Sequence, residues 1–115
     1  MTEDEVRLWH VTVTVAGVPM EPLIVRGALQ RLNEQRPFIS TLRFSADRAE
    51  IGYWDEAATL VDAASLGLRL WNEYRESANL PFWEVVGLEV VEREVRIGRE
   101  QYDAWVDLHV APRPF

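Results

Sequence analysis

The chain has 115 residues, which is long enough for one domain with a single core and too short for two ordinary domains. Hydrophobic residues make up 48% and charged residues 27% of it, as is typical of a soluble globular protein, and no apolar run reaches the roughly 20 residues of a membrane helix. The absence of cysteine excludes disulfides and zinc-thiolate sites, and the net charge of −7 argues against nucleic acid as a partner, because an acidic surface repels phosphates.

Residues 6–15 predict the first strand. Apolar and polar residues alternate there, which is the period-2 pattern of a strand with one buried face. The buried face would carry Trp9, Val11, Val13 and Val15, and the other face His10, Thr12 and Thr14. A helix over residues 21–35 follows, because Pro22 suits a first helical turn and apolar residues then recur at three- and four-residue spacings.

Residues 40–54 predict two strands around a turn at Asp47 and Arg48. The register that aligns the apolar side chains pairs Ala46 with Ala49, Phe44 with Ile51 and Leu42 with Tyr53. The opposite face would then carry Thr41, Arg43, Ser45, Glu50, Gly52 and Trp54. Agreement between pairing and hydrophobicity favours an antiparallel hairpin with one buried face.

A long helix capped by Asp55 is expected next, ending near residues 77–81, and residues 83–94 predict a fourth strand rich in β-branched residues. One face of that strand would carry Val86, Leu88 and Val90, and the other Val85, Gly87, Glu89 and Val91. Beyond residue 97 the pattern is less clear, and we expect the proline-bearing end to be frayed.

The order β, α, β, β, α, β predicts an α+β protein with a ferredoxin-like sandwich. Its four-stranded antiparallel sheet would have the strand order 4-1-3-2, with both helices on one face. We expect residues 1–97 to form this domain and residues 98–115 to be a C-terminal extension, partly ordered or packing on the domain or a partner. The predicted core is Val11, Val13, Leu42, Phe44, Ile51, Tyr53, Leu60, Leu68, Trp71, Val86, Leu88 and Val90.

Three segments carry a resemblance to a known group of proteins: HVTVTVAG, ADRAEIGYW and LWNEYRESANLPFWEVVGLEVVERE. From His10 to about Glu94 the chain resembles a family of small uncharacterised actinobacterial proteins, many of them from Streptomyces. That family carries no assigned reaction, ligand or partner, so the resemblance implies no functional residues. The exclusive use of arginine for all 12 basic residues also indicates a GC-rich, actinobacterial source, and the acidic start MTEDEVR predicts a cytoplasmic protein without a signal peptide.

The sheet face without helices, called the open face below, is the predicted functional surface. His10 would lie there close to Glu50 or Glu89, and a histidine beside a carboxylate is the minimum equipment for acid-base chemistry. Polar residues at alternate positions are also what a half-solvated sheet requires, and this favours His10 as a surface or interface group without chemistry. The predicted interface residues are Leu8, His10, Thr12, Arg43, Trp54, Val85 and Val91.

These residues favour a non-catalytic self-association or protein-interaction module, a homodimer or the partner of another protein, rather than an enzyme. The alternative is a small cofactor-free enzyme or small-molecule-binding domain, with His10 and Glu50 or Glu89 in a pocket closed by a second subunit. No cofactor and no metal are expected, because the glycines form no phosphate-binding loop and Glu100, Asp103, Asp107 and His109 fit a solvated acidic tail.

Overall fold

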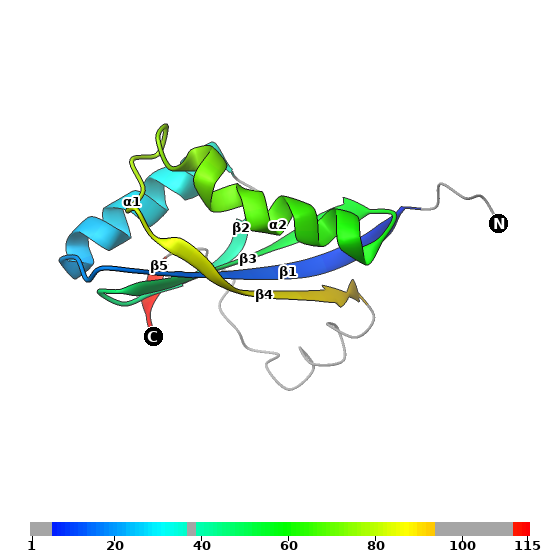
Figure 1. Ribbon diagram of the computed structural model, residues 1–115, viewed down its shortest axis with the longest axis horizontal. Helices are drawn as coiled ribbons and strands as arrows, with labels where there is room; N and C mark the ends of the chain where they lie inside the picture. The colour runs from blue at the N-terminus through cyan, green and yellow to red at the C-terminus, as the bar shows by residue number, and fades with distance from the viewer. Residues whose placement is uncertain (1–5, 37–38, 94–111) are drawn as a thin grey trace.

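The computed structural model describes residues 6–36, 39–93 and 112–115, coloured in Figure 1. Its elements in chain order are β1 (Arg7–Ala16), α1 (Pro22–Gln35), β2 (Ile39–Phe44), β3 (Arg48–Ala57), α2 (Leu60–Tyr74), β4 (Glu84–Glu92) and β5 (Pro112–Pro114). The predicted order β, α, β, β, α, β is confirmed over residues 7–92. Neither of these two helices is long and apolar enough to cross a membrane.

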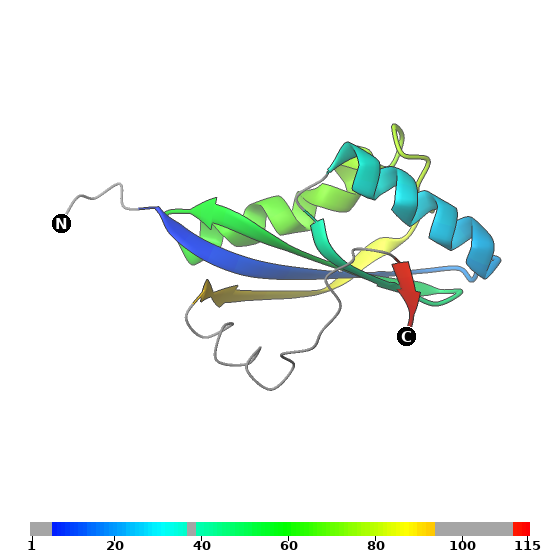
Figure 2. The same ribbon diagram turned by 180° about the vertical axis from the view of Figure 1, so that it is seen from behind.

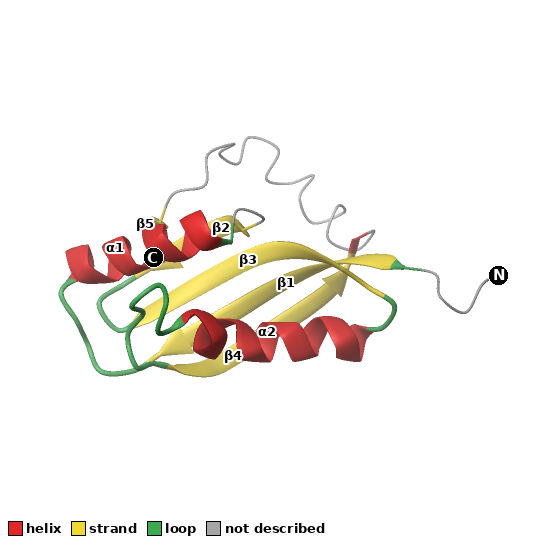
Figure 3. Cartoon of the chain, turned by 90° about the horizontal axis from the view of Figure 1, so that it is seen from above, coloured by secondary structure: helices red, strands yellow, loops and turns green. Residues whose placement is uncertain are grey.

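One sheet organises the domain, with the strand order β4-β1-β3-β2-β5. The first four strands in that order pair antiparallel, which confirms the predicted 4-1-3-2 arrangement and the α+β class. Both helices lie on the same side of the sheet, as Figures 1 and 2 show from opposite directions. Seen from above in Figure 3, α2 runs over β1 and β4 while α1 lies toward β2. The opposite side is the open face.

The core lies between the sheet and the helices, and its composition follows the alternation of the strands. The predicted core residues that are buried are Val11, Val13, Leu42, Phe44, Ile51, Tyr53 and Trp71, and Leu88 and Val90 pack partly buried against them. The prediction is wrong for Leu60, Leu68 and Val86, which are 49%, 51% and 59% exposed.

A β-bulge in β4 explains the error at Val86. Thr14 of β1 pairs with Gly87, but the next residue, Val15, pairs with Val85, so Val86 is an extra residue without a partner across the ladder. An extra residue reverses the face of everything that precedes it in the strand. Val85, predicted on the open face, therefore packs against the core, and Val86 is turned out to solvent.

The β2–β3 hairpin has the predicted faces in a register that differs by two residues. Phe44 pairs with Ala49 rather than Ile51, and Leu42 pairs with Ile51 rather than Tyr53. The carbonyl groups of Ala46 and Asp47 accept hydrogen bonds from backbone N–H groups of the β1–α1 loop, at 2.7 and 3.1 Å, so these residues form a turn instead of extending the ladder. A shift of two preserves every face, because side chains alternate with period 2.

The second helix begins later than predicted. Asp55 lies within β3, and Thr59 caps α2 by accepting a hydrogen bond from the Asp62 backbone N–H at 3.2 Å. Leu60 is therefore the first helical residue, at the edge of the packed surface. The helix packs on the sheet through Ala63, Gly67, Leu70 and Trp71, and this leaves Leu68 on its exposed flank.

The end of the chain forms a fifth strand, where we predicted a frayed segment. Pro112–Pro114 pairs parallel with β2, and the Phe115 backbone N–H donates to the Phe44 carbonyl at 2.9 Å. Prolines alternate in β5 and have no N–H, so the side turned away from β2 lacks those two amide donors, which protects the sheet edge from further pairing. The predicted domain boundary at residue 97 lies outside the described residues.

Candidate functional site

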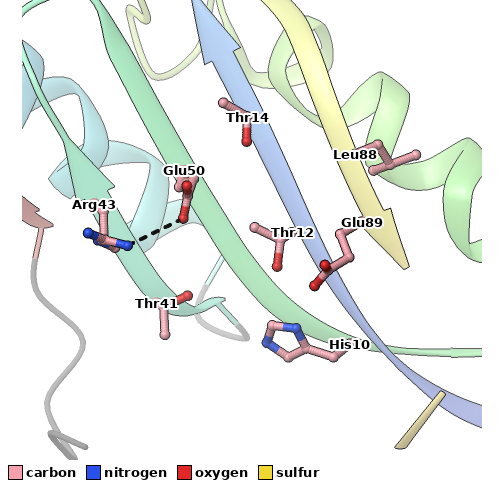
Figure 4. Close-up of a pocket in the computed structure, with 8 residues that line it drawn as sticks. All are labelled: His10, Thr12, Thr14, Thr41, Arg43, Glu50, Leu88 and Glu89. Carbon is pink, nitrogen blue, oxygen red and sulfur yellow. Dashed lines mark ion pairs between the residues drawn. The ribbon is translucent and has the colours of Figure 1, made fainter. Parts of the chain in front are cut away.

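The open face holds a cavity of about 470 Å³, a size that accommodates a small organic molecule. It lies over the four antiparallel strands, and Figure 4 shows the side chains around it. The described residues that line it are His10, Thr12, Thr14, Thr41, Arg43, Glu50, Leu88 and Glu89. Leu88 differs from the others, because its side chain points toward α2 and packs against the core. The lining is therefore polar, with hydroxyl, carboxylate, guanidinium and imidazole groups.

The pairing of the strands arranges the lining residues in two rows across the sheet. One row runs from β4 to β2 through Gly87, Thr14, Glu50 and Arg43. The next row runs through Glu89, Thr12, Gly52 and Thr41. The rows set glycines beside threonines of neighbouring strands, Gly87 beside Thr14 and Gly52 beside Thr12 and Thr41. The long side chains of the two rows are those of Glu50, Arg43 and Glu89.

Gly52 has no side chain and therefore leaves space at the bottom of the cavity, between Thr41 and His10; this part is called the floor below. A Cβ atom at this position would overlap the Thr41 hydroxyl and lie 3.4 Å from Cε1 of the His10 ring. Any larger residue would fill the space between these two side chains. The sequence placed Gly52 on the open face, but its role depends on neighbours in two other strands.

His10 closes one end of the cavity and is only 3% exposed, so its side chain is buried within this chain, whereas the sequence favours a surface or interface group. It lies between Trp54 of β3 and Val91 of β4. The imidazole meets the Trp54 indole in an edge-to-face contact, with ring centroids 5.0 Å apart and an interplanar angle of 78°. Edge-to-face geometry of this kind is one of the arrangements that aromatic rings prefer.

The two predicted carboxylate neighbours of His10 lie at different distances from it. Glu89 faces Thr12, two residues along β1, and a diagonal neighbour of this kind is about 7–8 Å away between backbones. Glu50 lies four residues along β3 from the partner of His10, or about 13 Å. It faces Arg43 instead, with 3.9 Å between Nη1 and Oε1. The structure thus brings Glu89, and not Glu50, to the side of His10.

The other predicted interface residues lie on the open face, with the exception of Val85. Leu8, Trp54 and Val91 are half-buried on the open face, and Thr12 and Arg43 line the cavity. Val85 belongs to the core, as described above. Thr14 and Thr41 also line the cavity, although they are not among the predicted site residues. Their alternation with buried residues placed them on the correct face, but nothing in the sequence showed that this face is hollow.

A second polar cluster, formed by Arg36, Tyr53, Asp55 and Tyr74, lies on the helix side of the sheet, away from the cavity. Burial raises the pKa of the Tyr53 hydroxyl well above its usual range, so the group stays neutral at physiological pH. The Arg36 guanidinium donates to the Tyr74 hydroxyl at 2.7 Å and lies over the Tyr74 ring. Burial also raises the pKa of the Asp55 carboxyl. The hydrogen bond from the Glu56 backbone N–H and the positive charge of Arg36 lower this pKa but offset the rise only in part.

We expect Asp55→Asn to stabilise the protein at pH 7 and not at pH 3. Because the pKa of Asp55 is raised in the folded state, its ionised form opposes folding. The free energy of unfolding that depends on Asp55 therefore falls as the pH rises above 3.8, the ordinary pKa of this carboxyl. Urea unfolding should show a higher midpoint for the variant at pH 7, and the difference should disappear at low pH. Glu34→Gln, on the exposed side of α1, is the control. An equal midpoint for Asp55→Asn and wild type at pH 7 would refute this interpretation.

Comparison with known proteins places the chain in a family without assigning it an activity. The matching family model spans residues 8–104 and so includes all the described residues that line the cavity. Curated proteins give no match. Because the match covers most of the 115 residues, the chain belongs to the family described as Domain of unknown function (DUF8830).

Proposed function

We propose that this protein is a non-catalytic binding domain that holds a small polar molecule in the cavity of its open face. The observation that carries the proposal is the cavity itself, about 470 Å³ of space bounded by a buried imidazole and by charged and hydroxyl side chains. A sheet face that only meets water needs no hollow of this kind. In ligand pockets, polar groups that converge on a concave site fix the orientation of the ligand and provide specificity.

The lining indicates the chemistry of the ligand. Arg43 is a donor, Glu50 and Glu89 are acceptors when ionised, and the hydroxyls of Thr12 and Thr41 serve as either. A ligand that satisfies these groups carries both acceptors and donors, such as hydroxyl, amide, carboxylate or amino groups on a small framework. An apolar ligand would leave them without hydrogen bonds and would bind poorly.

Binding is better supported than catalysis. An acid-base enzyme could use His10 with Glu89, which are diagonal neighbours on adjacent strands. The cysteine-free chain contributes no thiolate nucleophile, and the register pairs Thr12 with Glu89 and Thr14 with Glu50 rather than pairing either threonine with the imidazole of His10. We therefore keep a cofactor-free enzyme as the alternative, to be recognised by turnover that His10→Gln abolishes without loss of ligand affinity.

A thermal-shift screen with polar small molecules tests the proposal. Amino acids, sugars, polyols and small hydroxy acids, each at millimolar concentration, should include compounds that raise the unfolding temperature of the wild type, because ligands stabilise the state that binds them. The same compounds should fail to stabilise Thr12→Val, which removes one hydroxyl from the cavity floor at almost constant volume. Equal stabilisation of both proteins would place the binding site elsewhere.

Self-association through the same face is a second proposal, supported by the half-buried apolar residues Leu8, Trp54 and Val91 beside the cavity. A second copy packed on this face would cover them and close the pocket. We expect a homodimer whose dissociation constant rises at least tenfold in Trp54→Asp, as measured by light scattering over a concentration series. Phe82→Asp, in the exposed α2–β4 loop, is the control. A wild-type monomer at every concentration contradicts the proposal, and so does a dimer unaffected by Trp54→Asp and by Leu8→Asp.

We also infer a ferredoxin-like classification from the βαββαβ order and the 4-1-3-2 sheet. Ferredoxin-like domains commonly use this sheet face for assembly or binding, which agrees with both proposals at the level of analogy. An actinobacterial source and a cytoplasmic location remain part of the proposal. The use of arginine for all 12 basic residues supports the actinobacterial source.

A further inference from the structure

The ring of Phe115 contacts two guanidinium groups at the margin of the cavity. The Cζ atoms of Arg43 and Arg48 lie 4.9 and 4.7 Å from the ring centroid. The backbone of Phe115 is tied to β2, because the Phe115 N–H donates to the Phe44 carbonyl at 2.9 Å. The preceding strand β5 pairs with β2, which carries Arg43. Phe115 is thus anchored beside a residue that lines the pocket.

The Arg43 side chain is not fixed by its ion pair with Glu50. Its side chain is 51% exposed, and the 3.9 Å between its Nη1 and Oε1 of Glu50 is too long for a direct hydrogen bond. An exposed ion pair of this geometry contributes little and does not fix a long, flexible side chain. A guanidinium over an aromatic face gains a second attraction, from the ring quadrupole and from stacking.

We propose that Phe115 is a positioning residue for the pocket, since its ring holds the Arg43 guanidinium at the cavity margin beside Glu50. Phe115 then belongs to the binding site although it is not among the described residues that line the cavity. Its value to a ligand rests on the proposed binding function. The positioning itself can be measured on the protein alone.

The test compares Phe115→Leu with a matched variant at a similar contact. Phe82 is 84% exposed and lies under Arg75, with the Arg75 Cζ atom 4.5 Å from its ring, in a loop that does not line the cavity. Leucine preserves an apolar side chain and the backbone N–H but has no aromatic face. ¹⁵N relaxation of the arginine Nε–Hε groups reports how ordered each guanidinium is. We expect greater mobility of Arg43 in Phe115→Leu but not in Phe82→Leu, where only Arg75 should change.

A chemical probe gives an independent measure. Phenylglyoxal modifies accessible guanidinium groups, and the rate at Arg43 can be followed by peptide mass spectrometry. We expect the rate to rise about two- to fivefold in Phe115→Leu, the factor that an exposed cation–π contact supplies, and Phe115→Trp to restore the wild-type rate. Arg69, exposed on α2, should react equally in all variants.

The inference is overturned if Arg43 has the same order and the same modification rate in wild type and Phe115→Leu. It is equally overturned if Phe115→Leu and Phe115→Trp behave alike, since a merely structural role would not distinguish an aromatic ring from leucine. Both measurements are made without a ligand. A failure of the ligand screen would therefore leave this result intact, and a failure here would leave ligand binding in the cavity intact.

Discussion

Trp71→Ala is expected to lower the free energy of unfolding by about 3–5 kcal/mol, the usual cost of truncating a buried tryptophan. Trp71 is fully buried, and its ring stacks on Trp83 with centroids 6.2 Å apart and planes 5° from parallel. Its indole N–H donates to the Pro81 carbonyl at 3.1 Å, so the substitution removes a large packed volume and one of the two hydrogen bonds that this carbonyl accepts, the other coming from the Trp83 backbone N–H at 2.8 Å.

Urea or thermal unfolding measures this effect. A domain of this size has a total stability of about 5–15 kcal/mol, so the loss should lower the midpoint temperature by more than roughly 10 °C. Phe82→Ala is the matched control, because this aromatic residue follows Pro81, the hydrogen-bond partner of Trp71, and is 84% exposed. A cost below about 1 kcal/mol for Trp71→Ala, or an equal cost for the control, would mean that the α2–β4 packing is not as described.

Gly52→Ala is expected to weaken ligand binding at least tenfold while the fold is retained. The added methyl group would occupy the floor of the cavity, against the Thr41 hydroxyl and within 3.5 Å of His10 Nε2. The Thr41 hydroxyl is the end of a rotatable side chain and can move aside, and alanine suits a strand at least as well as glycine does. The structural cost is therefore small, but the volume available to a ligand falls.

Calorimetric titration with a compound from the thermal-shift screen measures the change in affinity. Gly27→Ala serves as the control, since a methyl group on α1 meets only an Arg31 side-chain nitrogen at 3.5 Å and should stabilise the helix without touching the cavity. Unchanged affinity in Gly52→Ala, with an unfolding temperature close to that of wild type, would show that ligands do not use the floor between His10 and Thr41.

Residue alternation was sufficient to predict most of the fold. Strict period-2 patterns in β1, β2 and β3 place Val11, Leu42 and Ile51 on one face whatever the exact pairing. For this reason a hairpin register that was wrong by two residues still gave the correct core. The strand order followed from the element order, because each helix connects strands on one side of the sheet.

The failures occur where structure depends on contacts distant in sequence. No local signal distinguishes a regular β4 from one with a bulge at Val86, because a run of β-branched residues has no clear period. Likewise, two prolines indicate a frayed end until a neighbouring strand is present to accept the Phe115 N–H. In both cases the partner strand decides the outcome.

For the candidate site, too, alternation predicts which face a residue lies on but not the contacts between strands. Alternation placed His10, Arg43 and Glu50 on the open face, and the structure brings them to one cavity. The cavity itself arises from the alignment of Gly52 and Gly87 with threonines on neighbouring strands, which depends on the exact register. The support of Arg43 by Phe115 joins residues more than 70 positions apart and could not be predicted from spacing.

The most direct test of the binding proposal is a ¹H–¹⁵N NMR titration with a stabilising polar compound, observing the backbone amides and the His10 ring. Saturable shifts should be largest at Gly52, Gly87 and the His10 imidazole, which mark the floor and one end of the cavity. Amides on the outer side of α1 should not move. Shifts confined to other surfaces, or no saturable shift for any compound of the screen at millimolar concentration, would contradict the proposal that this cavity binds a small polar molecule.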